Sequence, residues 1–382
     1  MNKIFITIPS LNESKNISFV TKTLDKGLSG YFSDFQNYIV NVDSNSSDNT
    51  VEQFISTKTN TSKISLICPK GKVGKGFGIY TGFKYGIKNK GDHFAMIDSD
   101  LKSINKKWVN RLLQPIIKGA DYVVPLYARN RYEGNTTNHF SSPVIYACFG
   151  YDLVQPIAGD FALSCRLTKA VIKNFSIPND FLYGVDSLIS LTALLGKYEI
   201  KQQKLDKKIH NPSFGKINKI FIGEACSTFY LMNKNRHAIL NLLKTKKSTK
   251  LFPNKIADEK FISKPKIKEI NSLREFAVNE IDKFDYNELI GKDYVKILKK
   301  NTYSIYSELW AEILTDFIII LLRRKLTYEN VLKLTQSLLP LYLLRVISYF
   351  QEIDGKSSLD VDVIIKQQKK LTRTLLLDKL NI

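Results

Sequence analysis

The chain has 382 residues, of which 43% are hydrophobic and 24% are charged, and it contains only 19 glycines and 11 prolines. This composition is typical of folded globular proteins and excludes a disordered or fibrous chain. The four cysteines include no CxxC pair, which excludes a zinc ribbon or a redox motif of that kind. We therefore expect a protein that folds without disulfides in a reducing cytoplasm.

The formal net charge of +21 favours an anionic partner such as nucleic acid, anionic lipid or a phosphorylated substrate. The charge does not distinguish among these partners, and biased genome composition can equally produce a lysine-rich chain. The most apolar segment, residues 313–322, is far shorter than the roughly 20 residues that cross a bilayer, so it predicts a buried helix. Residues 1–9 contain no long apolar stretch, and we expect neither a secretory signal nor a transmembrane segment.

The first half of the chain alternates β-branched runs with helical patterns. The expected strands are residues 4–9, 38–43, 64–69, 93–98 and 121–126. The expected helices between them are residues 14–27, 48–57, 76–89 and 106–118. This order predicts an α/β fold with a mostly parallel sheet, helices on both faces and ligands at the carboxyl ends of the strands.

From about Lys216 onward, amphipathic helical patterns replace the strand patterns. The expected helices are residues 219–244, 267–282, 305–323, 327–350 and 358–380. The predicted organisation is a catalytic domain, a lysine-rich connector and a C-terminal helical domain, over residues 1–243, 244–266 and 267–382. We expect the helical domain to serve packing or assembly without catalytic residues, because apolar side chains such as Ile313, Phe317 and Leu321 recur at helical spacing.

An Asp-x-Asp motif, Asp98-Ser99-Asp100, follows the apolar residues of the fourth expected strand. Side chains alternate along a strand, so the two carboxylates would project to the same side near its end. Mg²⁺ and Mn²⁺ take oxygen ligands and leave coordination positions for substrate phosphates. The motif therefore indicates a divalent metal site for a nucleoside diphosphate, although Asp-x-Asp also occurs in ordinary turns.

Three further polar segments lie after expected strands or before a helix: residues 9–13 (PSLNE), 42–48 (VDSNSSD) and 74–76 (GKG). Each alone also fits a helix cap, a turn or a glycine-rich loop. In this order, together with Asp-x-Asp, they resemble the nucleotide-sugar-binding half of a GT-A glycosyltransferase. The resemblance implies a Rossmann-like nucleotide-diphospho-sugar transferase fold, with base and ribose held by the first loop and the acid after the second strand.

Downstream motifs narrow the resemblance. Residues 153–161 (LVQPIAGDF), 183–186 (YGVD) and 207–210 (KKIH) are similar to the retaining synthases of glucosylglycerate, glucosyl-3-phosphoglycerate and mannosylglycerate. The similarity covers roughly residues 4–215, more than half of the chain. A weaker similarity at residues 338–346 points to longer members of the glucosylglycerate branch.

The resemblance implies roles for individual residues. Asp100 and His210 would be the metal ligands, and Asp98 and Asp186 would be the catalytic residues beside the sugar. A surface histidine is the ordinary alternative for His210, and a buried aspartate paired with a lysine is the ordinary alternative for Asp186. The residues implied in donor binding are Pro9, Leu11, Glu13, Asp43, Ser44, Lys75, Asp98, Ser99, Ile157, Gly159, Tyr183 and Asp186.

The acceptor side departs from the family pattern. The resemblance implies acceptor binding by Arg131, Gly134, Asn135 and Thr137. The phosphoglycerate-using enzymes have an arginine where Asn135 stands, and arginine suits phosphate and carboxylate oxygens. The missing arginine favours D-glycerate over 3-phosphoglycerate, although Arg129 or Arg131 could supply the charge.

Together these motifs imply a metal-dependent hexosyltransferase that moves a hexose, with glucose favoured, from a UDP-, GDP- or ADP-sugar to D-glycerate. Synthesis of glucosyl-3-phosphoglycerate or mannosylglycerate is the alternative. A nucleotidyltransferase usually opens with a glycine- and arginine-rich phosphate loop, which residues 9–13 lack. A nucleic-acid or anionic-membrane binder would explain the charge, but no RNP, KH or zinc module is visible. We expect a cytoplasmic homodimer that makes a compatible solute and has no nucleic-acid partner.

Overall fold

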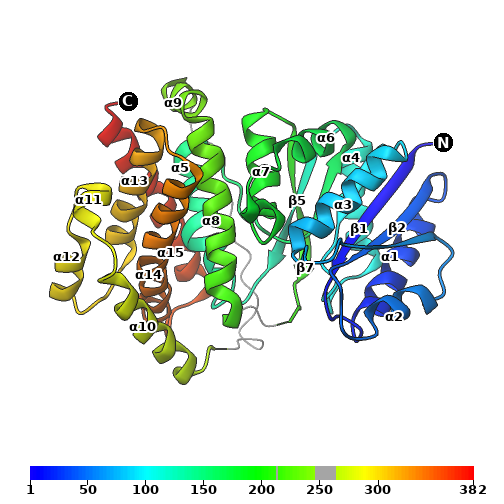
Figure 1. Cartoon of the computed structure of the whole chain (residues 1–382), viewed down its shortest axis with the longest axis horizontal. Coiled ribbons are helices and arrows are strands. Elements are labelled where there is room, and N and C mark those ends of the chain that lie inside the picture. The colour runs from blue at the N-terminus through cyan, green and yellow to red at the C-terminus, as the bar shows by residue number, and fades with distance from the viewer. Residues whose placement is uncertain (212–213, 246–263) are drawn as a thin grey trace. The chain divides into compact units, whose positions relative to one another are not determined.

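The computed structural model describes residues 1–211, 214–245 and 264–382, which form two compact units (Figure 1). Unit 1 contains Met1–Ala128 and the described residues of Ile157–Ser213. Unit 2 contains Arg129–Pro156 and the described residues of Phe214–Ile382. Most of the predicted connector, residues 244–266, lies outside the described residues.

Unit 1 is built on a seven-stranded sheet with the order β3-β2-β1-β4-β6-β5-β7. Strand β1 pairs in parallel with β2 and β4, β2 with β3, and β5 with β7, whereas β6 runs antiparallel to both of its neighbours. The strands are β1 Lys3–Ser10, β2 Gln36–Asp43, β3 Ser62–Ile67, β4 His93–Met96, β5 Tyr122–Ala128, β6 Phe161–Ser164 and β7 Ile200–Lys207. The sheet is mostly parallel, as predicted, so β1, β2 and β4 end at one edge.

The helices of unit 1 form two layers. Helix α1 contacts α2 and α4, while α3 contacts α6 and α7. The chain runs outward from β1 to β3 through α1 and α2, and it then returns to β4 through α3. Parallel crossovers are right-handed, so this reversal of direction places α3 on the face of the sheet opposite to α1 and α2. The helices are α1 Ile17–Tyr31, α2 Thr50–Ser56, α3 Lys75–Lys88, α4 Lys106–Ile117, α6 Cys165–Asn174, the short 3₁₀ helix Pro178–Phe181 and α7 Val185–Leu195.

The predicted α/β pattern of the first half is confirmed, and the strands that it missed are β6 and β7. Strand β6 has only four residues, which is too short for a periodic pattern. Strand β7 reads IKQQKLDK and lies at the edge of the sheet, where it pairs only with β5. A polar edge strand lacks the apolar run that marks a buried parallel strand.

Unit 2 is helical, with α10 to α15 coloured from yellow to red in Figure 1. Among its described helices, α8 packs against α14 and α13 packs against α15. They are a π-helical turn Thr137–Ser141, α5 Ser142–Phe149, a 3₁₀ turn Phe214–Lys216, α8 Ile217–Lys234, α9 Arg236–Thr245, α10 Ile267–Ile281, α11 Tyr286–Ile290, α12 Tyr294–Lys300, α13 Ser307–Arg323, α14 Tyr328–Glu352 and α15 Ser358–Leu380.

The two units divide the chain differently from the predicted boundary at residue 243. Residues 129–156 and 214–243 belong to the helical unit. Every residue of α5 is buried, and α5 contacts α9 and α15, which lie far along the chain. An excursion of this kind leaves no linker or shift of composition, so the sequence pattern could not reveal it.

The apolar helix faces of unit 2 are covered within the unit. Ile313, Phe317 and Leu321 of α13 are fully buried, which confirms the buried helix predicted for this segment. Helix α14 is long and apolar enough to cross a membrane by length and composition, but 78% of its apolar window is buried inside the protein. Its fully buried Arg345 pairs with Glu352 at 2.9 Å. A buried charge with a partner on the same helix is typical of a core helix.

Candidate active site

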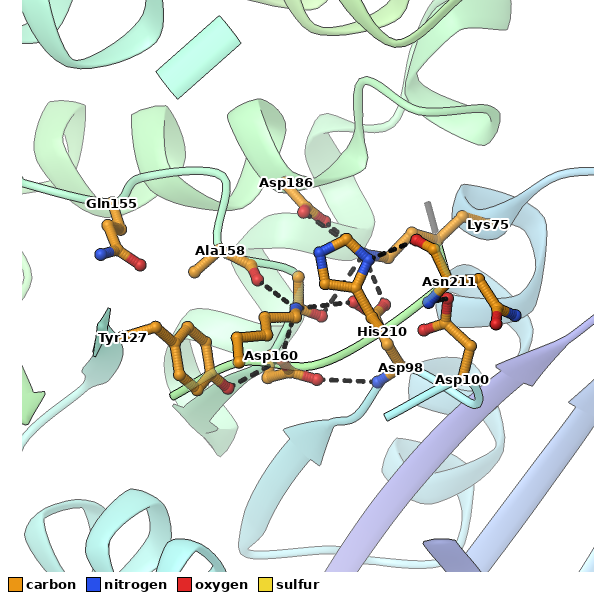
Figure 2. Close-up of polar contacts among 12 residues, drawn as sticks. Lys75, Asp98, Asp100, Tyr127, Gln155, Ala158, Asp160, Asp186, His210 and Asn211 are labelled. Carbon is orange, nitrogen blue, oxygen red and sulfur yellow. Dashed lines mark hydrogen bonds and ion pairs between the residues drawn. The ribbon is translucent and has the colours of Figure 1, made fainter. Parts of the chain in front are cut away.

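The polar residues singled out in the sequence gather at the carboxyl edge of the parallel strands in unit 1. Asp98 and Asp100 lie in the loop after β4, and His210 lies in the segment after β7. Lys75 and Asp186 begin the helices α3 and α7. Figure 2 shows these side chains pointing toward one another from different elements.

Helix α3 brings Lys75 to the site because a stripe of glycines lets the helix lie close on β1. A Cβ atom at Gly78 would stand 2.8 Å from the Cβ of Pro9, and one at Gly82 would stand 2.4 Å from Thr7 Cγ2. Real Cβ atoms do not approach so closely, so larger residues would push the helix away. The first turn of α3 therefore sits directly over the end of β1.

Five charged side chains form an alternating chain, Asp186–Lys75–Asp98–Lys208–Asp160. Lys75 Nζ lies 2.9 Å from Asp98 Oδ1 and 3.2 Å from Asp186 Oδ1. Lys208 Nζ lies 3.1 Å from Asp98 Oδ2 and 2.8 Å from Asp160 Oδ2. Asp160 and Lys208 are buried, so each of these charges depends on its partners.

The pKa directions follow the position of each carboxyl in this cluster. Burial raises the pKa of Asp98, but Lys75 and Lys208 outweigh burial and hold that pKa well below its usual range. Burial raises the pKa of Asp186 by more than Lys75 lowers it. Burial and the negative charge of Asp98 raise the pKa of Asp100. Negative charge is therefore least compensated at Asp100 and Asp186.

The two carboxylates of the Asp-x-Asp motif have different partners. Strand β4 ends at Met96, so the alternation expected from a strand through residue 98 does not fix their directions. Asp98 pairs with the two lysines, whereas Asp100 Oδ2 accepts the backbone N–H of Asn211 at 3.1 Å. The loop thus places Asp98 against the two lysines and Asp100 beside His210 (Figure 2).

The ring of His210 is oriented by the next residue. Its Nδ1 lies 2.7 Å from the carbonyl oxygen of Asn211. A carbonyl only accepts, so Nδ1 carries the hydrogen and the neutral ring has its lone pair at Nε2. A metal-binding histidine commonly donates its other ring N–H to a carbonyl in this way.

Gly159 lies at the centre of the cluster with φ +93°, a conformation that L-residues rarely adopt. Its neighbours are fixed by hydrogen bonds: Lys208 Nζ donates to the carbonyl of Ala158 at 2.7 Å, and Tyr127 Oη donates to Asp160 Oδ2 at 2.8 Å. The backbone N–H of Asp98 donates to Asp160 Oδ1 at 2.8 Å. This turn therefore lies against the Asp-x-Asp loop with no room for a side chain.

Comparison with known proteins gives a family match for the part of unit 1 that contains Lys75, Asp98, Asp100 and Asp160. Residues 5–173 match the model of Glycosyl transferase family 2. The match, together with the mostly parallel sheet and its helices, shows a GT-A fold with a C-terminal helical region. It supports a glycosyltransferase domain within residues 5–173.

Individual proteins are similar over part of the chain. The "Putative glycosyltransferase CsbB" of Bacillus subtilis (strain 168) is 26% identical over 207 residues, which are 53% of this chain and 60% of that protein. The chain thus spans less than two thirds of the length of this relative.

Solved structures of glucosyl-3-phosphoglycerate synthase from Mycobacterium tuberculosis also overlap. The complex with Mn²⁺, UDP and phosphoglyceric acid has 23% identity and a TM-score of 0.48, covering 60% of this chain and 78% of that one. The complex with Mg²⁺ and UDP has 23% identity and a TM-score of 0.47, covering 60% and 79%.

In unit 1, the acid after β2 fixes the loop in which it lies. Asp43 is buried and accepts the N–H and the Oγ–H of Ser46 at 2.7 and 2.6 Å, together with the Oγ–H of Ser10 at 3.0 Å. These bonds tie the loop after β2 to the end of β1. The carboxylate predicted to contact the nucleotide thus also positions the two loops that would surround it.

The other residues predicted for donor binding also lie in unit 1, and their roles stay predictions. Pro9, Ser44, Ser99 and Gly159 are buried, and Leu11 is 43% exposed. Lys75 is paired with Asp98 and Asp186, so its amine is part of the charged cluster. Partly buried positions are occupied by Glu13, Ile157 and Tyr183.

The residues predicted for acceptor binding lie in unit 2 and are engaged there. The guanidinium of Arg131 donates to the backbone carbonyl of Lys356 and to Ser358 Oγ. Asn135 Nδ2 donates to the backbone carbonyl of Tyr132 at 3.0 Å. Gly134 has φ +67°, and Thr137 begins the buried π-helical turn. Their role toward an acceptor stays a prediction.

Sequence reasoning missed Lys208, Asp160, Tyr127 and Asn211. Asp160 is the last residue of the QPIAGD motif, and Lys208 and Asn211 lie within two residues of His210. Their closeness in sequence to these motifs was the signal that could have identified them. Their long-range pairings across the sheet, such as Lys208 with Asp98, depend on topology and leave no local pattern.

Replacing Gly159 by alanine is expected to abolish the activity of this site. The new Cβ would stand 2.2 Å from Asp98 Oδ2 and 2.9 Å from Lys208 Nζ, and φ +93° would add backbone strain. Steady-state turnover measures the effect, with Gly119→Ala as control, because Gly119 also has a positive φ but nothing within 4 Å. Equal losses in the two variants would show that backbone strain alone is responsible.

Proposed function

We propose that this protein is a retaining, metal-dependent hexosyltransferase that moves a hexose from a nucleoside diphosphate sugar to D-glycerate. The match to glycosyl transferase family 2 supports the transferase class. The resemblance of the QPIAGD, YGVD and KKIH segments supports the glycerate-type acceptor. Synthesis of glucosyl-3-phosphoglycerate or mannosylglycerate is the alternative within the same class.

The observation that carries the proposal is the charge of the cluster at the sheet edge. The cluster contains four carboxylates, those of Asp98, Asp100, Asp160 and Asp186, and two ammonium groups, those of Lys75 and Lys208. The excess of two negative charges would repel a diphosphate. A divalent cation supplies the compensating charge, which makes the site suited to a nucleoside diphosphate only together with a metal.

The residues at the site fit such a cation with two protein ligands. Among the residues that the structure describes, no group of three or more His, Cys, Asp or Glu side chains is arranged to hold a metal. Mg²⁺ is often held by one or two carboxylates together with substrate phosphates and water. Asp100 and the Nε2 atom of His210 are the proposed ligands, although imidazole is softer than these ions prefer. When bound, the cation stabilises the negative charge of the departing diphosphate.

The protein's own residues position the reactants. Lys75 holds Asp98 and Asp186 side by side, so two carboxylates are available to accept hydrogen bonds from sugar hydroxyl groups. Because Asp186 lies at the start of α7 and is buried, its direction is fixed. We assign Asp186 to orientation of the sugar for attack on the same face as the leaving group, so that the configuration is retained.

Free D-glycerate is expected to be a better acceptor than 3-phosphoglycerate. Asn135 stands where an arginine would bind the phosphate, and a hydrogen bond to a charged group contributes about 1.5–3 kcal/mol. Since about 1.4 kcal/mol is a factor of ten, loss of one contact weakens phosphate recognition by roughly ten- to a hundredfold. The ratio of kcat/KM for the two acceptors measures this, and a clear preference for 3-phosphoglycerate would contradict it.

A donor panel tests the proposed function itself. UDP-, GDP- and ADP-glucose and GDP-mannose are each incubated with D-glycerate or 3-phosphoglycerate and Mn²⁺ or Mg²⁺, and the product is analysed by NMR. We expect one donor to give an α-linked glycoside of the glycerate. In a parallel incubation with a nucleoside triphosphate and glucose 1-phosphate, formation of a nucleotide sugar with release of pyrophosphate would instead assign a nucleotidyltransferase. Homodimer formation and a cytoplasmic location stay predictions.

A further inference from the structure

Asn211 connects the loop after β1 with the two proposed metal ligands. Its backbone N–H donates to Asp100 Oδ2 at 3.1 Å, and its carbonyl accepts from His210 Nδ1 at 2.7 Å. Its side-chain Nδ2 lies 3.2 Å from Glu13 Oε1 and 3.4 Å from Glu13 Oε2. Figure 2 shows Asn211 directly beside Asp100 and His210. The backbone of Asn211 thus contacts the two proposed metal ligands, and its side chain contacts the loop after β1.

Glu13 is held at several points. Its backbone N–H donates to Thr50 Oγ1 at 2.8 Å, and its Oε2 accepts from Asn16 Nδ2 at 2.7 Å. The Asn16 contact stays within the loop and the start of α1, whereas the Asn211 contact reaches across the sheet edge to the segment after β7. The Asn211 contact thus links the Glu13 carboxylate to the residue whose backbone N–H binds Asp100.

We propose that the side chain of Asn211 is a positioning residue that couples nucleotide binding at residues 9–13 to divalent-metal binding at Asp100 and His210. The inference rests on the proposed function, because it takes the nucleotide loop and the two metal ligands from it. A nucleoside that fixes Glu13 also fixes Asn211, which orients both metal ligands. By linkage, the nucleoside raises metal affinity by the same factor by which the metal raises nucleoside affinity.

The test uses a ligand that cannot touch the metal. A diphosphate would bind the cation directly and hide the coupling through the protein, so the probes are uridine, guanosine and adenosine with Mn²⁺. Calorimetry measures the Mn²⁺ affinity of the whole protein with and without the saturating nucleoside. The ratio of these affinities is the coupling factor.

Asn211→Ala removes the bond to Glu13 and leaves both backbone contacts in place. Asn16→Ala is the matched control, because it removes the other side-chain amide on the same carboxylate and leaves Asn211 untouched. Asn211→Ser is the second variant, since a shorter polar side chain keeps the segment solvated and also fails to reach Glu13. Melting temperatures confirm that each variant is folded.

In the unmutated protein we expect the nucleoside to raise Mn²⁺ affinity by about fivefold or more, the lower end of ordinary coupling. In Asn211→Ala and Asn211→Ser the factor is expected to fall to within about twofold of one. Asn16→Ala is expected to keep the coupling.

Full coupling in Asn211→Ala, or equal loss in Asn16→Ala, would overturn the inference. The inference would also fail, with the proposed function intact, if nucleoside and Mn²⁺ both bound to the unmutated protein independently of each other. Failure of UDP, GDP and ADP to bind even with Mn²⁺ would instead overturn the proposed function. The two failures are therefore distinguishable.

Discussion

Asp100→Ala is expected to abolish turnover, with a loss greater than about a hundredfold. Among the described residues, the ion pairs of the Asp-x-Asp motif with lysine are made by Asp98, whereas the pKa of Asp100 is raised by burial and by the charge of Asp98. Loss of a residue that merely supports a metal ligand costs about 10–100-fold, and loss of a ligand costs more. Steady-state turnover and Mn²⁺ binding by calorimetry measure the two effects in parallel.

Asp34→Ala is the control for this substitution, because Asp34 is exposed and remote from the cluster in sequence. We expect full turnover from Asp34→Ala and an unchanged melting temperature for Asp100→Ala, since Asp100 lies in a loop beyond β4. Full activity of Asp100→Ala, or of the unmutated enzyme in EDTA, would contradict the metal site.

Lys208→Met is expected to destabilise unit 1 and to reduce turnover. Lys208 Nζ contacts Asp98, Asp160 and the Ala158 carbonyl, and the side chain of Asp160 is fully buried. Removal of one partner of a buried ion pair costs about 3–5 kcal/mol, because the other charge remains buried without compensation. Urea denaturation followed by circular dichroism measures the loss of stability.

A second substitution separates stability from positioning. Lys208→Met combined with Asp160→Asn removes both charges, so most of the stability is expected to return. Turnover is expected to stay low, because Asp98 has still lost one of its two lysines. Lys204→Met, on the exposed side of β7, is the control and should leave both quantities unchanged. Recovery of full turnover in the double variant would limit Lys208 to a structural role.

Local sequence patterns were sufficient for the sheet and for the position of the site along it. Strands β1 to β5 have apolar runs, and the polar loops after β1, β2 and β4 stand where parallel strands end. Apart from the first two residues of β1, these strands and loops lie within residues 5–173, the range that matches glycosyl transferase family 2. Short-range periodicity and turn chemistry depend on residues that are close in sequence, which is why they could be predicted.

The pairings inside the site could not be predicted in the same way. Whether Asp98 faces a metal or a lysine depends on Lys75 and Lys208, which come from the start of α3 and the end of β7. The excursion of residues 129–156 into the helical unit depends on packing against α15 at the other end of the chain. Both features arise from contacts distant in sequence, for which a single chain carries no signal.

The melting temperature of the unmutated protein with candidate ligands tests the central claim most directly. A ligand that binds only the native state raises the melting temperature by mass action. We expect Mn²⁺ together with one nucleoside diphosphate hexose to raise it well above the values with either component alone, and above the values with RNA or anionic vesicles. No shift with any nucleotide sugar, or a larger shift with RNA or vesicles, would contradict the assignment of the charged cluster as a metal–diphosphate site.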